Sequence, residues 1–96
     1  PTMTDGDPPI EIPIEDSLDL HAIPPAETAD VVEAYLEEAV VRGFAEVRLI
    51  HGRGIGVQRE ITRKVLARSA HVVAFHDAPP GRGGWGATVA LLRRPE

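Results

Sequence analysis

Cysteine is absent from this chain of 96 residues. Its absence excludes disulfide bonds, zinc–thiolate sites and thiol nucleophiles, and nothing points to an oxidising compartment, so we expect a cytoplasmic protein. Long apolar runs are absent as well: none approaches the roughly 18 residues of a membrane span. The N-terminus also lacks the basic and apolar regions of a signal peptide. We therefore expect no membrane partner.

Aromatic residues are scarce, with one Trp, one Tyr and two Phe, although 43% of the chain is hydrophobic. The core is therefore expected to consist mainly of Val, Leu, Ile and Ala, and the length suffices for one domain. Residues 1–9 combine two acids with Gly and Pro and carry little that could be buried. We expect residues 1–9 to form a disordered acidic tail and residues 10–96 to form a single domain.

Basic residues are nearly missing from the first half of the chain. Residues 1–46 contain twelve acids and one Arg, whereas residues 47–96 contain nine basic residues and three acids. The net charge of −5 by itself argues against a nucleic-acid partner. The uneven distribution instead predicts one acidic and one basic region, and the basic region could face a polyanion.

Hydrophobic periodicity predicts four strands and two helices. Pro13 limits residues 10–15 to a lead-in or an edge strand, and Gly43 is a natural left-handed helix stop. We predict an α/β two-layer sandwich of order β-α-β-α-β-β with a four-stranded mixed sheet. The strands are expected over residues 17–20, 47–50, 71–75 and 87–92, and the helices over residues 25–42 and 57–69.

Each predicted helix has an apolar stripe. In the first helix the stripe is Val31, Tyr35, Leu36, Ala39 and Val40; in the second it is Val57, Ile61, Val65 and Leu66. The other face of the second helix carries Arg59, Arg63, Lys64 and Arg68, so we expect a cationic side that meets solvent or a polyanion.

Three turns that follow strands are predicted to converge. Strands connected through helices should run parallel, so the carboxyl ends of the first three strands share one edge of the sheet. The loops at that edge contain His21, the turn from His51 to Gly56 and the start of the 77–86 loop. Open α/β sheets bind ligands beyond such strand ends.

The segment His51-Gly52-Arg53-Gly54-Ile55-Gly56 leads from a strand into a helix. Glycines let backbone amides approach an anion, and a helix start adds partial positive charge, which indicates phosphate binding. The spacing matches neither the Walker nor the dinucleotide-binding pattern. A plain structural turn is the alternative.

The same turns carry groups that could hydrolyse a phosphodiester, a reaction that needs a base, an acid and positive charge at the phosphate. His21 could serve as base or acid, Asp19 could orient an imidazole or hold a cation, and His51 could be the second proton-transfer group. Arg53 could clamp the phosphate with the Gly52 and Gly54 amides. Alternatively, Asp19 and His21 are simply the polar face of a strand.

We predict no metal ligands, because one carboxylate and two separated histidines are not a diagnostic set; a divalent metal at Asp19 stays open. The basic helix face could track a nucleic-acid backbone or could be an ordinary solvated face. Trp85 could stack on an unpaired base or anchor its loop. The residues predicted to bind phosphate or nucleic acid are Gly52, Arg53, Gly54, Gly56, Arg59, Arg63, Lys64, Arg82, Gly84 and Trp85.

Three segments together resemble a known family: LDLH at 18–21, VRLIHGRGIGVQREI at 47–61 and DAPPGRGGWGATVALL at 77–92. They are similar to the small MutS-related (Smr) domain, over about residues 18–92, and the DAPP and GGWGAT segments resemble its short, free-standing members. The resemblance implies a sandwich like the C-terminal domain of bacterial translation initiation factor three. It also implies binding of DNA or RNA, which several family members nick or cleave.

The resemblance also implies site residues. Asp19 and His21 of the LDLH segment become active-site candidates, and the HGxG segment adds His51, Gly52, Arg53 and Gly54. Many members have Gly directly after LDLH, whereas this chain has Ala22.

Three functions remain open: an endonuclease related to mismatch-repair proteins, a noncatalytic DNA- or RNA-binding module, and a protein-interaction or anion-binding domain. We expect a monomer, although the sequence does not define the oligomeric state.

Overall fold

The computed structural model describes residues 14–54 and 56–94. The tail expected over residues 1–9 and most of the edge strand expected over residues 10–15 lie outside the described residues. The elements are β1 (Ser17–Asp19), α1 (Pro25–Val41), β2 (Glu46–Ile50), α2 (Val57–Arg68), β3 (Val72–Asp77), the 3-10 turns η1 (Pro80–Arg82) and η2 (Gly84–Gly86), and β4 (Ala87–Leu92).

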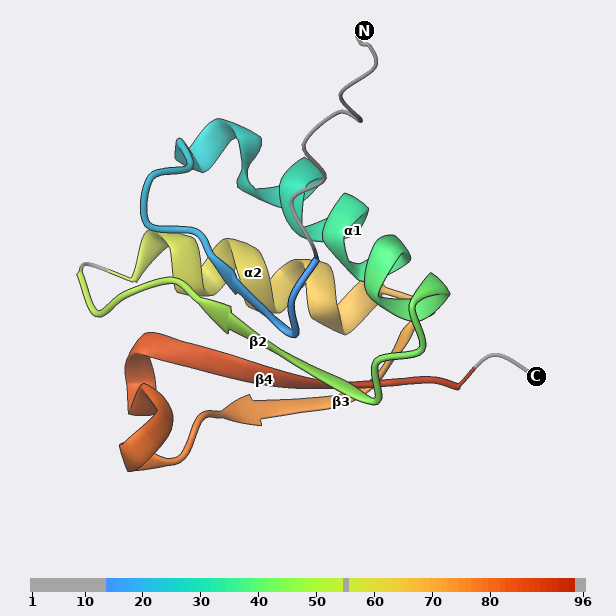
Figure 1. The fold of residues 1–96 in the computed structure, drawn as a ribbon. Coiled ribbons are helices and arrows are strands. Elements are labelled where there is room, and N and C mark those ends of the chain that lie inside the picture. Colours follow the sequence, from blue (N-terminus) through green and yellow to red (C-terminus); the bar gives the residue numbers. More distant parts are fainter. Residues whose placement is uncertain (1–13, 55, 95–96) are drawn as a thin grey trace, which may run out of the picture.

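The four strands form one mixed sheet in the order β1-β2-β4-β3. β1 pairs parallel with β2, and β4 pairs antiparallel with both β2 and β3. β1, β2 and β3 therefore point the same way, and both helices lie on one face of the sheet (Figure 1). The predicted two-layer sandwich and mixed sheet are confirmed. The insertion of β4 between β2 and β3 was not predicted.

Local sequence sets both ends of α1. Pro24 is extended and Pro25 occupies the first turn, where a missing N–H costs no helical hydrogen bond. At the other end Gly43 adopts a φ of 79°, and its N–H donates to the carbonyl of Val40 at 3.0 Å. The N–H of Phe44 donates to the carbonyl of Ala39 at 3.0 Å, which completes a Schellman motif. The predicted stop at Gly43 is therefore confirmed.

The core lies between the helices and the sheet and is mainly aliphatic, with Leu20, Leu36, Leu49 and Leu66 all at 1% exposure or less. The predicted stripes need two corrections. In α1, Thr28 and Val32 are fully buried, whereas Val31 and Val40 only border the core. In α2, Val57 is 42% exposed and Thr62 is buried, because Val57 lies in the first turn, next to the glycine loop.

The segment between β3 and β4 covers part of the sheet face opposite the helices. Ala78, Ala87 and Val89 form a small second cluster there, against which Ile50 packs. A guanidinium N–H of Arg48 (Nη1) donates to the carbonyl of Arg82 at 2.9 Å and ties η1 to β2. In the described residues, neither helix is long and apolar enough to cross a membrane.

Candidate nucleic-acid interface

The turns after β1 and β2 meet at the end of the sheet where the parallel strands finish, at the left of Figure 1. Gly52 adopts a φ of +82°, which favours glycine, and a Cβ atom there would lie 3.7 Å from the Nδ1 atom of His21. His21 is exposed. The first turn therefore presents a solvent-accessible imidazole directly beside the backbone of the second turn.

The third turn contacts the second through Arg53 and the backbone of Gly86. A Cβ atom at Gly84 would lie 2.9 Å from Nη2 of Arg53, and one at Gly86 would lie 3.2 Å from its Cγ. The carbonyl of Gly86 accepts hydrogen bonds from the N–H groups of His51 and Gly52, at 3.0 and 2.9 Å. Arg53 thus lies across a surface where larger residues would collide with it.

Asp19 stabilises the backbone of the His21 turn. Its Oδ1 accepts a hydrogen bond from the backbone N–H of His21 at 2.8 Å, and both residues are exposed. This contact fixes the start of the turn without engaging the imidazole ring. The carboxylate therefore acts on the main chain of His21.

His51 has a different environment, with only 6% of its surface exposed. Its Nδ1 lies 3.1 Å from the carbonyl oxygen of Gly52, and its Nε2 lies 2.8 Å from the hydroxyl oxygen of Thr88. A neutral ring with its proton on Nδ1 accounts for both bonds, because a carbonyl can only accept. Burial lowers the pKa of the imidazole below its ordinary value, and the nearby charges of Arg59 and Arg63 lower it further.

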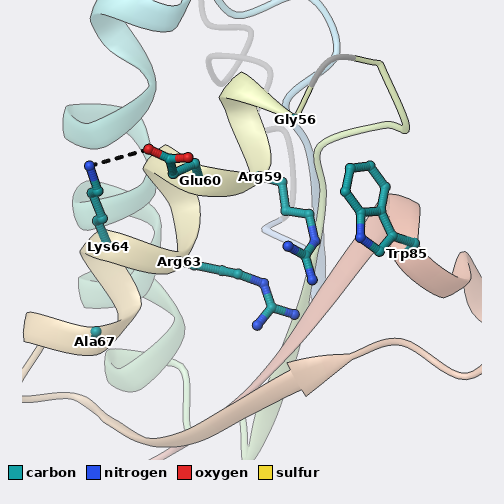
Figure 2. Close-up of a pocket in the computed structure, with 7 residues that line it drawn as sticks. All are labelled: Gly56, Arg59, Glu60, Arg63, Lys64, Ala67 and Trp85. Atoms are coloured by element: carbon teal, nitrogen blue, oxygen red, sulfur yellow. Dashed lines mark ion pairs between the residues drawn. The ribbon is translucent and has the colours of Figure 1, made fainter.

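Arg59 and Arg63 both donate to Oδ1 of Asp77, the last residue of β3; the Arg59 bond is 2.9 Å long. The hydrogen bond from Arg59 has the largest effect on the Asp77 carboxyl and, together with that from Arg63, lowers its pKa. The guanidinium carbon of Arg59 is 4.7 Å from the centre of the Trp85 ring, and that of Arg63 is 5.3 Å from the Phe75 ring. The two arginines therefore reach over the sheet, as Figure 2 shows.

The predicted cationic face of α2 consequently needs a correction. The Arg59 and Arg63 side chains are only 23% and 25% exposed, since aromatic rings and Asp77 hold them against the sheet. Lys64 is 72% exposed and pairs with Glu60 at 3.4 Å, and Arg68 pairs with Glu33 at 3.6 Å. Lys64 and Arg68 keep the solvent-facing position that the pattern indicated.

A groove of about 440 Å³ runs along this face of α2 and ends at the third turn. Trp85 forms one wall and is 40% exposed (Figure 2). Gly56, with a φ of +88°, is the N-cap of α2 at the same place, and a Cβ atom there would lie 3.5 Å from the Trp85 ring. The lining residues are Gly56, Arg59, Glu60, Arg63, Lys64, Ala67 and Trp85.

Residues 18–93 match the Smr domain family. This chain belongs to the Smr domain family. Endonuclease MutS2 of Thermus thermophilus is 45% identical over 76 residues, which are 79% of this chain and 10% of that protein. Endonuclease MutS2 of Streptococcus sanguinis is 38% identical over 76 residues, which are again 79% of this chain and 10% of that protein. The chain thus spans about a tenth of the length of these curated relatives.

Two solved structures share the fold of this Smr domain. The crystal structure of the Smr domain of Thermus thermophilus MutS2 matches with a TM-score of 0.77 and 44% identity, over 80% of this chain and 96% of the other. YdaL, a stand-alone small MutS-related protein from Escherichia coli, matches with a TM-score of 0.79 and 30% identity, over 85% of this chain and 67% of the YdaL chain. The likeness therefore extends to both a domain of a larger protein and a stand-alone protein.

The Smr domain does not bring all predicted residues together. Gly54 is exposed, and a Cβ atom there would touch nothing within 4 Å. Arg82 is exposed on η1 and does not line the α2 groove. In the described parts of the chain, no group of three or more His, Cys, Asp or Glu residues could hold a metal ion.

Three residues at this end of the Smr domain were missed: Gln58, Asp77 and Thr88. The amide nitrogen of Gln58 donates to the carbonyls of Leu20 (3.3 Å) and Ile23, and its oxygen accepts from the Thr28 hydroxyl. Gln58 thereby ties the His21 turn to α2. An isolated amide near a helix start carries no pattern that would have found it. Asp77 opens the loop that follows a predicted strand, and that position was a usable signal.

Proposed function

We propose that this Smr domain binds nucleic acid and hydrolyses a phosphodiester bond where the turn of His21 meets the turn that contains Gly52 and Arg53. The observation that carries the proposal is the exposed His21 imidazole, whose Nδ1 would lie 3.7 Å from a Cβ atom at Gly52. Its membership of the Smr family adds support, because the curated relatives are named endonucleases. The basic second half of the chain suits a polyanionic partner.

Each group has a role that follows from its surroundings. His21, exposed and beside the glycine turn, transfers a proton as base or acid. Arg53 and the exposed Gly54 backbone hold the phosphate, where negative charge develops during the reaction. The Gly52 amide already donates to the carbonyl of Gly86, so Gly52 shapes the turn and does not hold the phosphate. Asp19 is a positioning residue, since its carboxylate accepts the backbone N–H of His21.

His51 is better suited to positioning than to the proton transfer considered from the sequence. Its ring is buried, and both of its nitrogens are engaged, by Gly52 and Thr88. In our proposal His51 holds the glycine turn against β4, so that the Gly52 and Arg53 backbone keeps its shape.

Incubation with supercoiled plasmid and with structured RNA tests this proposal. The reactions include arms with Mg²⁺, with Mn²⁺ and with a chelator, so that a need for a divalent metal becomes visible. We expect the wild type to nick or cleave at least one substrate and His21→Ala to bind it without cleaving. His71→Ala is a matched control, because His71 lies directly before β3, at the other end of the sheet. Equal cleavage by His21→Ala and wild type contradicts the catalytic role.

A noncatalytic DNA- or RNA-binding module is the second candidate, and one observation favours it. Hydrolysis needs both a base and an acid, yet the burial of His51 leaves His21 as the exposed imidazole where the described turns meet. Ala22, in place of the glycine expected after LDLH, points the same way. Salt-sensitive binding with no cleavage in any arm would select this function. Absence of binding at low salt would leave a protein-interaction or anion-binding domain.

A further inference from the structure

The groove along α2 carries features that the phosphate site does not use. Its wall is the Trp85 ring, which is 40% exposed even though two neighbours hold it in place. Arg59 lies 4.7 Å from the ring centre, and a Cβ atom at Gly56 would lie 3.5 Å from the ring. A partly exposed aromatic ring beside a guanidinium offers surface on which a base can stack.

The charge of the groove suits a phosphate beside such a platform. Arg59 and Arg63 share one carboxylate, that of Asp77, so the three groups together keep a positive charge. Lys64 and Glu60 pair at 3.4 Å at the outer rim and cancel each other's charge, so the positive charge of the groove comes from the arginines. Figure 2 shows the arginines and Trp85 on the side of α2 that faces the sheet, with Lys64 and Glu60 farther out.

The position of the groove links it to the proposed site. Gly56 lines the groove as the N-cap of α2, and Arg53 lies across Gly84 and Gly86, the neighbours of Trp85. A nucleic-acid strand that places one phosphate at the Gly52–Arg53 turn therefore has an adjoining nucleotide close to Trp85. In a duplex the base faces are stacked and covered, so only an unpaired base can lie on the ring.

We propose that the α2 groove binds an unpaired nucleotide, with its base stacked on Trp85 and its phosphate held by the cationic side chains of α2. This inference rests on the proposed nucleic-acid binding and gives it a specificity. The Smr domain then prefers substrates in which a single-stranded segment adjoins the bound phosphate. Stacking accepts any base, so the groove selects strandedness and not sequence.

Trp85 is itself the probe for this inference, because the chain has one tryptophan. Titration with a single-stranded DNA and a single-stranded RNA oligonucleotide at low salt is expected to quench its fluorescence. A blunt duplex of the same sequence is expected to change the emission much less at equal saturation, with saturation followed independently by fluorescence anisotropy of a labelled strand. The DNA and RNA arms show which sugar the groove accepts.

Substitutions then assign the preference to the ring. Trp85→Ala is expected to weaken single-strand binding about tenfold and to leave duplex binding within about twofold, whereas Trp85→Phe retains most of the affinity. Arg68→Ala is the matched charge control, since Arg68 pairs with Glu33 and does not line the groove. Circular dichroism and thermal unfolding verify that each variant folds.

Two results overturn the inference while the proposed function stands. One is unchanged single-strand affinity in folded Trp85→Ala; the other is unaltered Trp85 emission in wild-type protein that anisotropy shows to be saturated. Failure of the wild type to bind any oligonucleotide at low salt is a distinct result, because it overturns the proposed function together with the groove. A tenfold loss confined to single strands supports the inference.

Discussion

The turns after β1 and β2 begin alike and end in opposite environments. Each has a histidine just beyond a strand, and the two strands are parallel neighbours, yet His21 is exposed while His51 is 6% exposed. β1 lies at the edge of the sheet formed by the described residues, and His21 at its end is exposed. β2 is flanked by β1 and β4, which brings Thr88 onto the His51 ring. Position in the sheet therefore separates a histidine suited to chemistry from one suited to structure.

The largest difference is expected in cleavage. If the proposed hydrolysis occurs, His21→Ala lowers the cleavage rate about 10²–10⁴-fold, because the site then lacks its accessible imidazole. This is the range for loss of a proton-transfer group. Thermal unfolding should stay close to wild type, since the side chain is exposed. Rates from plasmid nicking or RNA cleavage, measured beside the melting temperature, check both halves. A large drop in melting temperature would mean that His21 is structural and would remove the contrast with His51.

His51→Ala is expected to affect stability first. The change leaves the Thr88 hydroxyl buried without its partner and opens space under the glycine turn, which costs about 2–3 kcal/mol of unfolding free energy. Urea denaturation measures this loss. His51→Ala combined with Thr88→Val removes both polar groups, so the double variant should lose less than the sum of the two single losses. Simple additivity would contradict the pairing.

A substitution at Gln58 tests the His21 turn in the same way, because Gln58 ties that turn to α2. Gln58→Glu can still accept from Thr28 but cannot donate to the carbonyls of Leu20 and Ile23. We expect it to cost about 1–2 kcal/mol of stability and to lower any cleavage rate more than substrate affinity, because the His21 turn loses its tie to α2. Thr28→Val is the matched control, since it removes the hydroxyl contacts to Gln58 and to the Pro24 carbonyl but leaves the amide of Gln58 able to donate to Leu20 and Ile23. Equal effects of the two variants on cleavage would argue against a positioning role for Gln58.

The smallest expected effect is the contribution of His51 to the pH dependence of the unfolding free energy. The pKa of His51 in the folded domain lies below its unfolded value of about 6.5. Below about pH 6.5 the unfolded chain therefore binds a proton at His51 that the folded domain does not bind. This contribution to stability is complete above about pH 6.5 and is lost as the pH falls toward the folded-state pKa. Unfolding free energies at pH 8 and 5.5 should therefore differ more for wild type than for His51→Gln. Parallel pH profiles would show that His51 titrates alike in both states.

Much of the fold follows from local sequence. The extent of β4, the start of α1 at Pro25 and its stop at Gly43 agree with the predictions, because period, proline and glycine act on the nearest residues. Strand order does not follow, since the insertion of β4 between β2 and β3 depends on pairing between distant segments. The resemblance to the C-terminal domain of translation initiation factor three stays a prediction.

The candidate site was predictable in part, for the same reason. The meeting of the His21 turn with the turn that contains Gly52 and Arg53 follows from parallel strand direction. The burial of His51 does not, because it depends on Thr88 from a strand 37 residues away. Likewise the helical pattern placed Arg59 and Arg63 toward solvent, whereas Asp77 draws them onto the sheet. Long-range polar pairing leaves no periodic trace in the sequence.

The carboxylate of Asp77 acts as a built-in counter-ion for two guanidinium groups. Without it, Arg59 and Arg63 would repel each other and spread apart in the free domain. With it, the like charges are already gathered on one side of α2 before any partner arrives. The ordering of these long side chains then takes place during folding, and an incoming anion meets a preorganised surface.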